Sequence, residues 1–89
     1  MLEVVHTKRF DKSMFLAKRR GKDVSKAMAL VELLRIGQPL PARCKDHPLI
    51  GNYAGTREFK VEPNWLIVYR IENGILRLID TGTHSDLFD

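Results

Sequence analysis

Two histidines in the second half of the chain have the chemistry needed for proton transfer. His47 lies in a proline-rich stretch beside Lys45 and Asp46, and His84 follows Thr-Gly-Thr near the C-terminus. An imidazole changes charge near neutral pH, so two histidines brought together could act as acid and base. Spacing along the chain does not show that they meet, and a single histidine is more often structural or exposed than catalytic.

Neither a metal site nor a cofactor is expected from the remaining candidates. His6 ends a short β-branched segment, and nothing near it indicates chemistry. The three histidines are isolated, and Cys44 is the single cysteine. Zinc ligands usually occur in short pairs, and a lone thiol with no activating base is expected to be inert.

Charged side chains gather on the segment 56–61, where Arg57, Glu58 and Lys60 lie close together, and Arg70 and Arg77 lie on the strands expected beside it. One interpretation is a solvated sheet face with cross-strand charge pairs. The other is a phosphate cradle, because arginine binds anions through two parallel hydrogen bonds. The residues alone do not decide between them.

The aromatic side chains also allow two interpretations, packing in the core or stacking on a nucleic-acid base. Trp65 and Tyr69 lie four residues apart on the same side of one expected strand, where aromatics more often belong to the core than to a base-stacking platform. Phe88 is close to the C-terminus. It has little core to join there, so we expect it to stack on a base or to dock across the sheet.

Hydrophobic patterning predicts the elements that must position these side chains. A strand is expected at 2–6, followed by amphipathic helices at 8–20 and about 24–35 that end at Gly21 and Gly37. A long loop with three prolines spans 38–55, strands follow at 56–61, 65–71 and 75–80, and 85–89 form a short tail.

The order β-α-α-β-β-β predicts an α+β fold. We expect a two-helix hairpin packed on one face of an antiparallel sheet, which leaves the other face available for function. With 89 residues the chain should form one domain, residues 1–89. Its net charge of +4 favours phosphate-bearing partners. No disulfide, membrane span or secretory signal is indicated, so a cytoplasmic protein is expected.

Three blocks of sequence, found together in this order, resemble the YafQ-type toxins of the RelE/ParE superfamily. They are KDHPL at 45–49, EPNWLIVY at 62–69 and TGTHSDLF at 81–88. The resemblance implies a microbial-ribonuclease-like fold and cleavage of messenger RNA in the ribosomal A site. It further implies ribosomal RNA and mRNA as partners, inhibition by a DinJ-like antitoxin, and contact with operator DNA only through the antitoxin complex.

Carried over by position, the resemblance also implies which residues form the site. His47, His84 and Phe88 match residues implicated in activity, Glu58 stands where the family has an acidic residue, and Trp65 matches the family tryptophan. Two positions depart from the family. Lys60 replaces a further histidine, and Asn64 replaces an acidic residue, which puts in question how proton transfer is shared.

Cleavage by attack of the RNA 2′-hydroxyl needs a base, an acid and positive charge on the phosphorane, and no metal. We assign His84 as the general acid and His47 as the partner base or orienting group. Glu58 orients a histidine or serves as base. Lys60 and Arg57 stabilise charge. The remaining RNA or phosphate contacts are expected from Lys45, Arg70, Trp65 and Phe88.

Two other functions remain open from sequence. A non-catalytic, ParE-like inhibitor of DNA gyrase is disfavoured by a histidine in the TGTH block. A degenerate toxin that acts mainly as antitoxin partner and operon co-repressor is kept open by Lys60 and Asn64.

Overall fold

The computed structural model describes residues 1–88, and Asp89, the last residue of the expected tail and of the expected domain, lies outside the described residues. Its elements, in chain order, are β1 (Glu3–His6), α1 (Lys8–Arg19), α2 (Val24–Arg35), the 3₁₀ turn η1 (Ala42–Cys44), β2 (His47–Pro48), the 3₁₀ turn η2 (Gly51–Tyr53), β3 (Arg57–Glu62), β4 (Trp65–Glu72), β5 (Ile75–Gly82) and α3 (His84–Phe88).

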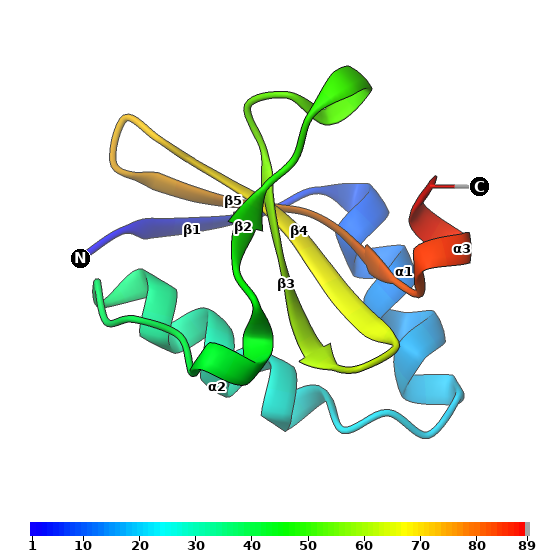
Figure 1. Cartoon of the computed structure of the whole chain (residues 1–89). Coiled ribbons are helices and arrows are strands. Elements are labelled where there is room, and N and C mark those ends of the chain that lie inside the picture. The colour runs from blue at the N-terminus through cyan, green and yellow to red at the C-terminus, as the bar shows by residue number, and fades with distance from the viewer. Residues whose placement is uncertain (89) are drawn as a thin grey trace.

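Both long helices begin at side-chain caps. The Thr7 side chain accepts a hydrogen bond from the backbone amide of Phe10, and Asp23 caps α2 by accepting from two amides in its first turn. Their apolar stripes are buried against the sheet, which confirms the two-helix hairpin on one face (Figure 1). None of the described helices is long and apolar enough to span a membrane.

The five strands form one sheet in the order β1-β5-β4-β3-β2. The expected α+β fold is confirmed, with two differences in the sheet. The long loop contributes a short strand, β2, which pairs antiparallel with β3. The first strand, β1, pairs parallel with β5, so the sheet is mixed. A parallel pair needs a crossover connection, and here the helices and the other strands provide it.

The two faces of the sheet are covered unequally. On the helix-covered face, Phe59, Ile67 and Tyr69 join the main core with residues of α1 and α2. On the opposite face, which we call the open face, a smaller cluster forms around Leu66, Val68, Leu87, Leu49, Ile79 and Phe88. Only a loop and the short helix α3 supply the cover here, so part of this face is accessible.

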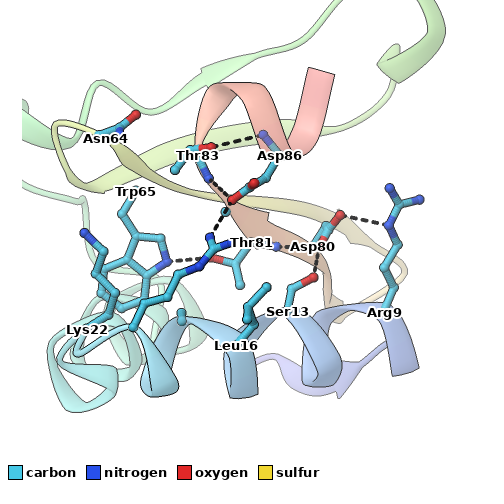
Figure 2. A pocket seen from close by; sticks show the side chains of 13 residues that line it. Arg9, Ser13, Leu16, Lys22, Asn64, Trp65, Asp80, Thr81, Thr83 and Asp86 are labelled. Atoms are coloured by element: carbon cyan, nitrogen blue, oxygen red, sulfur yellow. Dashed lines mark hydrogen bonds and ion pairs between the residues drawn. The ribbon is translucent and has the colours of Figure 1, made fainter. Parts of the chain in front are cut away.

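Helix α3 is held by a reciprocal cap at its first turn. Figure 2 shows Thr83 and Asp86 facing each other. The Thr83 amide donates to Asp86 Oδ2 at 3.0 Å, and the Asp86 amide donates to Thr83 Oγ1 at 3.0 Å. Arg20, at the end of α1, donates to Asp86 Oδ2 at 3.1 Å. The hydrogen bond from the Thr83 amide, aided by Arg20, lowers the pKa of Asp86.

The same contacts border a cavity of about 270 Å³ between α1, the end of β5 and α3 (Figure 2). Its floor is polar and well bonded. The Trp65 indole donates to Thr81 Oγ1 at 2.8 Å, and Asp80 accepts from Ser13 and pairs with Arg9. Helix α3 is therefore positioned by bonds to α1 as well as by the strand that precedes it.

Gly82 lets α3 approach β5 closely, and Gly82→Ala tests this. A Cβ atom at position 82 would lie 2.8 Å from Asp86 Cβ, so the cap must shift. Overpacking of this kind typically costs about 1–3 kcal/mol of unfolding free energy. Urea unfolding should show that loss, and the amide resonances of His84 and Phe88 should move. Ser85→Ala, an exposed change in the same helix, should stay within about 0.5 kcal/mol of wild type. Unchanged stability and spectra for Gly82→Ala would contradict the role of the glycine.

Candidate functional site

The accessible part of the open face carries a pair of ionisable side chains from two adjacent strands. β2 and β3 place His47 directly opposite Glu58. The His47 Nε2 atom lies 3.0 Å from Glu58 Oε1. The Glu58 side chain is 5% exposed, whereas that of His47 is 48% exposed. A buried carboxylate is costly unless it is paired, and His47 supplies the pairing at a site that solvent reaches.

The other ring nitrogen of His47 is held by the backbone. His47 Nδ1 lies 2.7 Å from the carbonyl oxygen of Lys45. Lys45 has φ 48° and ψ 48°, in the left-handed region of backbone conformation that residues other than glycine rarely adopt. This turn directs the Lys45 carbonyl toward His47. Both ring nitrogens therefore face acceptors. Only the imidazolium can donate to both, because a neutral imidazole carries one N–H.

The second oxygen of Glu58 has a different environment. Glu58 Oε2 is buried and has no hydrogen-bond partner within residues 1–88. Solvent does not reach this atom, so a substrate hydroxyl does not reach it in this arrangement either. Of the two roles considered for Glu58, the geometry favours orienting His47 over acting directly as a base.

His84 begins α3 and is exposed. Its ring makes no hydrogen bond or ion pair with any other described residue, and it lies 5.3 Å from the ring of Phe88. Phe88 in turn contacts Tyr53 edge to face at 5.1 Å, and Tyr53 donates to the Leu87 carbonyl at 2.9 Å. These contacts join the loop after β2 to α3, so the segment that follows His47 meets the helix that His84 begins.

Three further cations of the expected site lie around the pair. Lys60 follows Glu58 by two residues on β3, on the same face, and is partly exposed. Arg70 lies on the open face of β4, where it is exposed and pairs with Glu72 at 2.9 Å. Lys45 is exposed beside His47. All three remain predictions as RNA contacts.

Arg57 lies elsewhere than the expected site requires. It is on the helix-covered face, opposite Tyr69 on β4. Its Nε lies 3.2 Å from both Asp46 Oδ1 and the Tyr69 hydroxyl, which itself donates to Asp46 at 2.6 Å. Burial lowers the pKa of Arg57, but the Tyr69 hydroxyl and Asp46 outweigh it and raise the value overall. Arg57 thus lies on the other face of β3 from Lys60 and secures the loop that carries His47, and its contact with phosphate stays a prediction.

Trp65 also needs correction. Its side chain is 1% exposed and belongs to the main core. No base can stack on it in this structure, so its core interpretation holds and its RNA contact is withdrawn. Tyr69 is buried in the same way, and burial followed by the bond to Asp46 raises the pKa of its hydroxyl. Phe88 is half-buried by its neighbours and keeps an exposed part.

Sequence reasoning missed Asp46 and Tyr53 as positioning residues. Asp46 directly precedes His47, but its partners Arg57 and Tyr69 come from distant strands. Tyr53 lies between glycines at 51 and 55, and a lone aromatic in a glycine-rich loop was the available signal. The fold had to be known before either partner could be named.

The residues judged unrelated to chemistry lie away from this site. His6 pairs with Asp11 at 3.1 Å at the start of α1. Cys44 is fully buried, and burial raises the pKa of its thiol, so the reactive thiolate is disfavoured. Within residues 1–88, no three side chains of His, Cys, Asp or Glu gather as a metal-binding group.

Known proteins are similar to this chain in both sequence and fold. The chain is 40% identical to the mRNA interferase toxin YafQ of Escherichia coli strain K12 over 87 residues, which cover 97% of this chain and 95% of that protein. The crystal structure of YafQ from E. coli strain BL21(DE3) superposes with a TM-score of 0.94 at 38% identity, with all of both chains covered. The toxin in the E. coli DinJ–YafQ complex gives 0.91 at 39% identity, again over both whole chains.

A family profile agrees with these likenesses over nearly the entire length. Residues 2–89 match the family described as "Bacterial toxin of type II toxin-antitoxin system, YafQ". The family match, the identity to curated relatives and the shared fold all point the same way. The chain belongs to the YafQ family of bacterial type II toxin–antitoxin toxins.

Proposed function

We propose that this chain is an mRNA interferase that cuts messenger RNA in the ribosomal A site by attack of the 2′-hydroxyl on the adjacent phosphate. The observation that carries the proposal is the His47–Glu58 pair on the open face, where the imidazole is exposed and its carboxylate partner is buried. The relatives named mRNA interferase share this fold over the whole chain. The products would be a 2′,3′-cyclic phosphate and a 5′-hydroxyl.

We assign His47 to accept the proton from the 2′-hydroxyl, which must replace Glu58 or the Lys45 carbonyl as the partner of one ring nitrogen. In its neutral form, one ring nitrogen faces an oxygen acceptor with no hydrogen between them, either at Glu58 or at the Lys45 carbonyl. The 2′-hydroxyl can donate its proton to that nitrogen once it takes the place of the oxygen acceptor. Glu58 then stabilises the imidazolium, so it acts as a positioning and charge-balancing group.

His84 is suited to give a proton to the 5′-oxygen that leaves. Its ring nitrogens are unengaged by the described part of the chain, and the ring packs beside that of Phe88. Lys60 and Arg70 project from the same face and would stabilise the extra negative charge of the phosphorane. This set is small, which favours a role for the ribosome in fixing the geometry of the substrate.

The same proposal covers the partners and the location. The E. coli relative is known in a complex with DinJ, and we expect a DinJ-like antitoxin to neutralise this toxin, with operator DNA bound only through that complex. A chain of net charge +4 suits an acidic partner that folds on its surface. We take residues 1–89 as a single toxin domain that works in the cytoplasm, where ribosomes translate.

The first test is ribosome dependence. Purified toxin should cut a defined message at specific codon positions only while ribosomes translate it, because the small catalytic set relies on the A site to orient the RNA. Primer extension on an in vitro translation reaction measures this, with naked RNA as the control. Equal cutting of naked RNA would rule against the A-site model, and inhibition of gyrase without RNA cleavage would favour the ParE-like alternative.

His84→Ala should lower the single-turnover cleavage rate on programmed ribosomes by about 10²- to 10⁴-fold, the usual cost of losing a general acid. His84→Gln keeps more of the contact with Phe88 and should be equally impaired. His6→Ala is the matched control and should cleave normally, with circular dichroism confirming that all three variants fold. If folded His84→Ala protein cleaves within about threefold of the wild-type rate, another group must donate the proton.

Expression of the toxin alone should arrest growth, and co-expression with the neighbouring small open reading frame should restore it. The physical reason is that an acidic, partly disordered chain can cover the open face and bury the histidines as it folds. Colony counts measure the rescue, and co-purification checks that the two chains bind. Growth arrest that no adjacent gene relieves would contradict the toxin–antitoxin pairing.

A further inference from the structure

A second cavity, of about 310 Å³, lies beside the candidate site and is lined mostly by cations. We call it the basic pocket. Lys26 reaches it from α2, Arg43 from η1, Lys45 from the residue after η1 and Lys60 from β3, and the remaining wall is formed by Val61, Glu62 and Pro63. Three segments far apart in sequence thus direct positive charge toward one space.

The charges of the basic pocket are poorly balanced. Glu62 is the single carboxylate in its lining. That carboxylate is already shared by Lys22 at 3.5 Å and Lys26 at 3.4 Å. Among the described residues, Arg43, Lys45 and Lys60 make no ion pair. Four cations against one carboxylate leave a formal charge of +3 around one small cavity, which favours an anionic ligand.

Two covalent connections link the basic pocket to the His47–Glu58 pair. Lys45 lines the pocket with its side chain, while its carbonyl is the partner of His47 Nδ1. Lys60 lies two residues beyond Glu58 on the same face of β3, so the two positions are about 7 Å apart along the strand. A strand of RNA with its reactive phosphate at His47 would therefore meet the pocket within a short distance.

We propose that the basic pocket binds a backbone phosphate of the RNA next to the one that is cut. This inference rests on the proposed function and adds Lys26 and Arg43 to the residues that hold the substrate. The guanidinium of Arg43 offers paired donors to phosphate oxygens, and the lysines act as point charges. Contacts of this kind fix the register of the strand without reading its bases.

An acidic segment of a protein partner is the other chemistry that such a pocket could take. The RNA backbone is favoured because the pocket continues the same strand, β3, that carries Glu58. An RNA strand bound at His47 would lie within reach of this charge, whereas a protein partner could bind at many other basic positions on the chain.

The test compares Arg43→Gln and the double variant Lys26→Gln/Arg43→Gln with wild type. The probe is a single-stranded RNA of about ten nucleotides, fully 2′-O-methylated so that it cannot be cut. Binding is followed by fluorescence anisotropy between about 50 and 200 mM salt. Each lost phosphate contact should reduce the slope of log affinity against log salt by about 0.7, so the double variant should lose about 1.4.

The matched control is Lys12→Gln/Lys18→Gln, which removes two exposed charges from α1 outside the pocket. It should change the slope much less, and circular dichroism should show all variants folded. Equal loss of slope in pocket and control variants would overturn the proposal, because net charge alone would explain it. Unchanged RNA binding with weakened antitoxin binding would overturn it in favour of a protein ligand.

The two proposals fail in different ways. If wild-type toxin cuts message on ribosomes but the pocket variants bind RNA normally, the pocket proposal is overturned and the proposed function stands. If the wild-type toxin does not cut and the pocket variants still lose salt dependence, the proposed function fails. The pocket is then supported as a nucleic-acid site.

Discussion

The side chains of β4 from Trp65 to Tyr69 are all buried, so both faces of this central strand must be covered. Helices α1 and α2 cover one face, and most of the core lies there. Few residues remain to cover the other face, where Leu49 and the residues of α3 form a small second cluster. The rest of that face stays open. The candidate site lies at this boundary, where a buried Glu58 meets an exposed His47.

The loop between α2 and β3 depends on that arrangement. Its prolines keep it extended, and it gains order from side chains that it meets on the sheet. Asp46 bonds to Arg57 and Tyr69 on one face, while Tyr53 contacts Phe88 and the Leu87 carbonyl on the other. The hydrogen bond from the buried Tyr69 hydroxyl to the Asp46 carboxylate is costly to break. His47 is thus held between two anchored points.

Local patterns in the sequence were enough to predict much of the fold. The helices at 8–20 and about 24–35 and the three long strands agree with the structure within one or two residues, because apolar periodicity and glycine stops are local signals. In the strand expected at 56–61, the alternation of side chains places Arg57 and Phe59 on one face and Glu58 on the other, in agreement with the structure. Contacts between residues far apart in the sequence could not be predicted. The Asp46–Arg57 bond, the parallel pairing of β1 and the charge gathered around Lys26 and Arg43 all depend on tertiary contacts.

The parallel pairing of β1 with β5 has a consequence for folding during synthesis. The first strand pairs with residues 75–78, its Glu3 amide donates to the Gly74 carbonyl, and the Thr7 hydroxyl donates to the Ile79 carbonyl. Such contacts have nearly the largest sequence separation that the chain allows, and folding that waits for them is slow. The sheet cannot close while the last strand is still inside the ribosome. A nascent chain therefore cannot complete its sheet until β5 has left the ribosome, so the folded domain forms long after its first strand has been made.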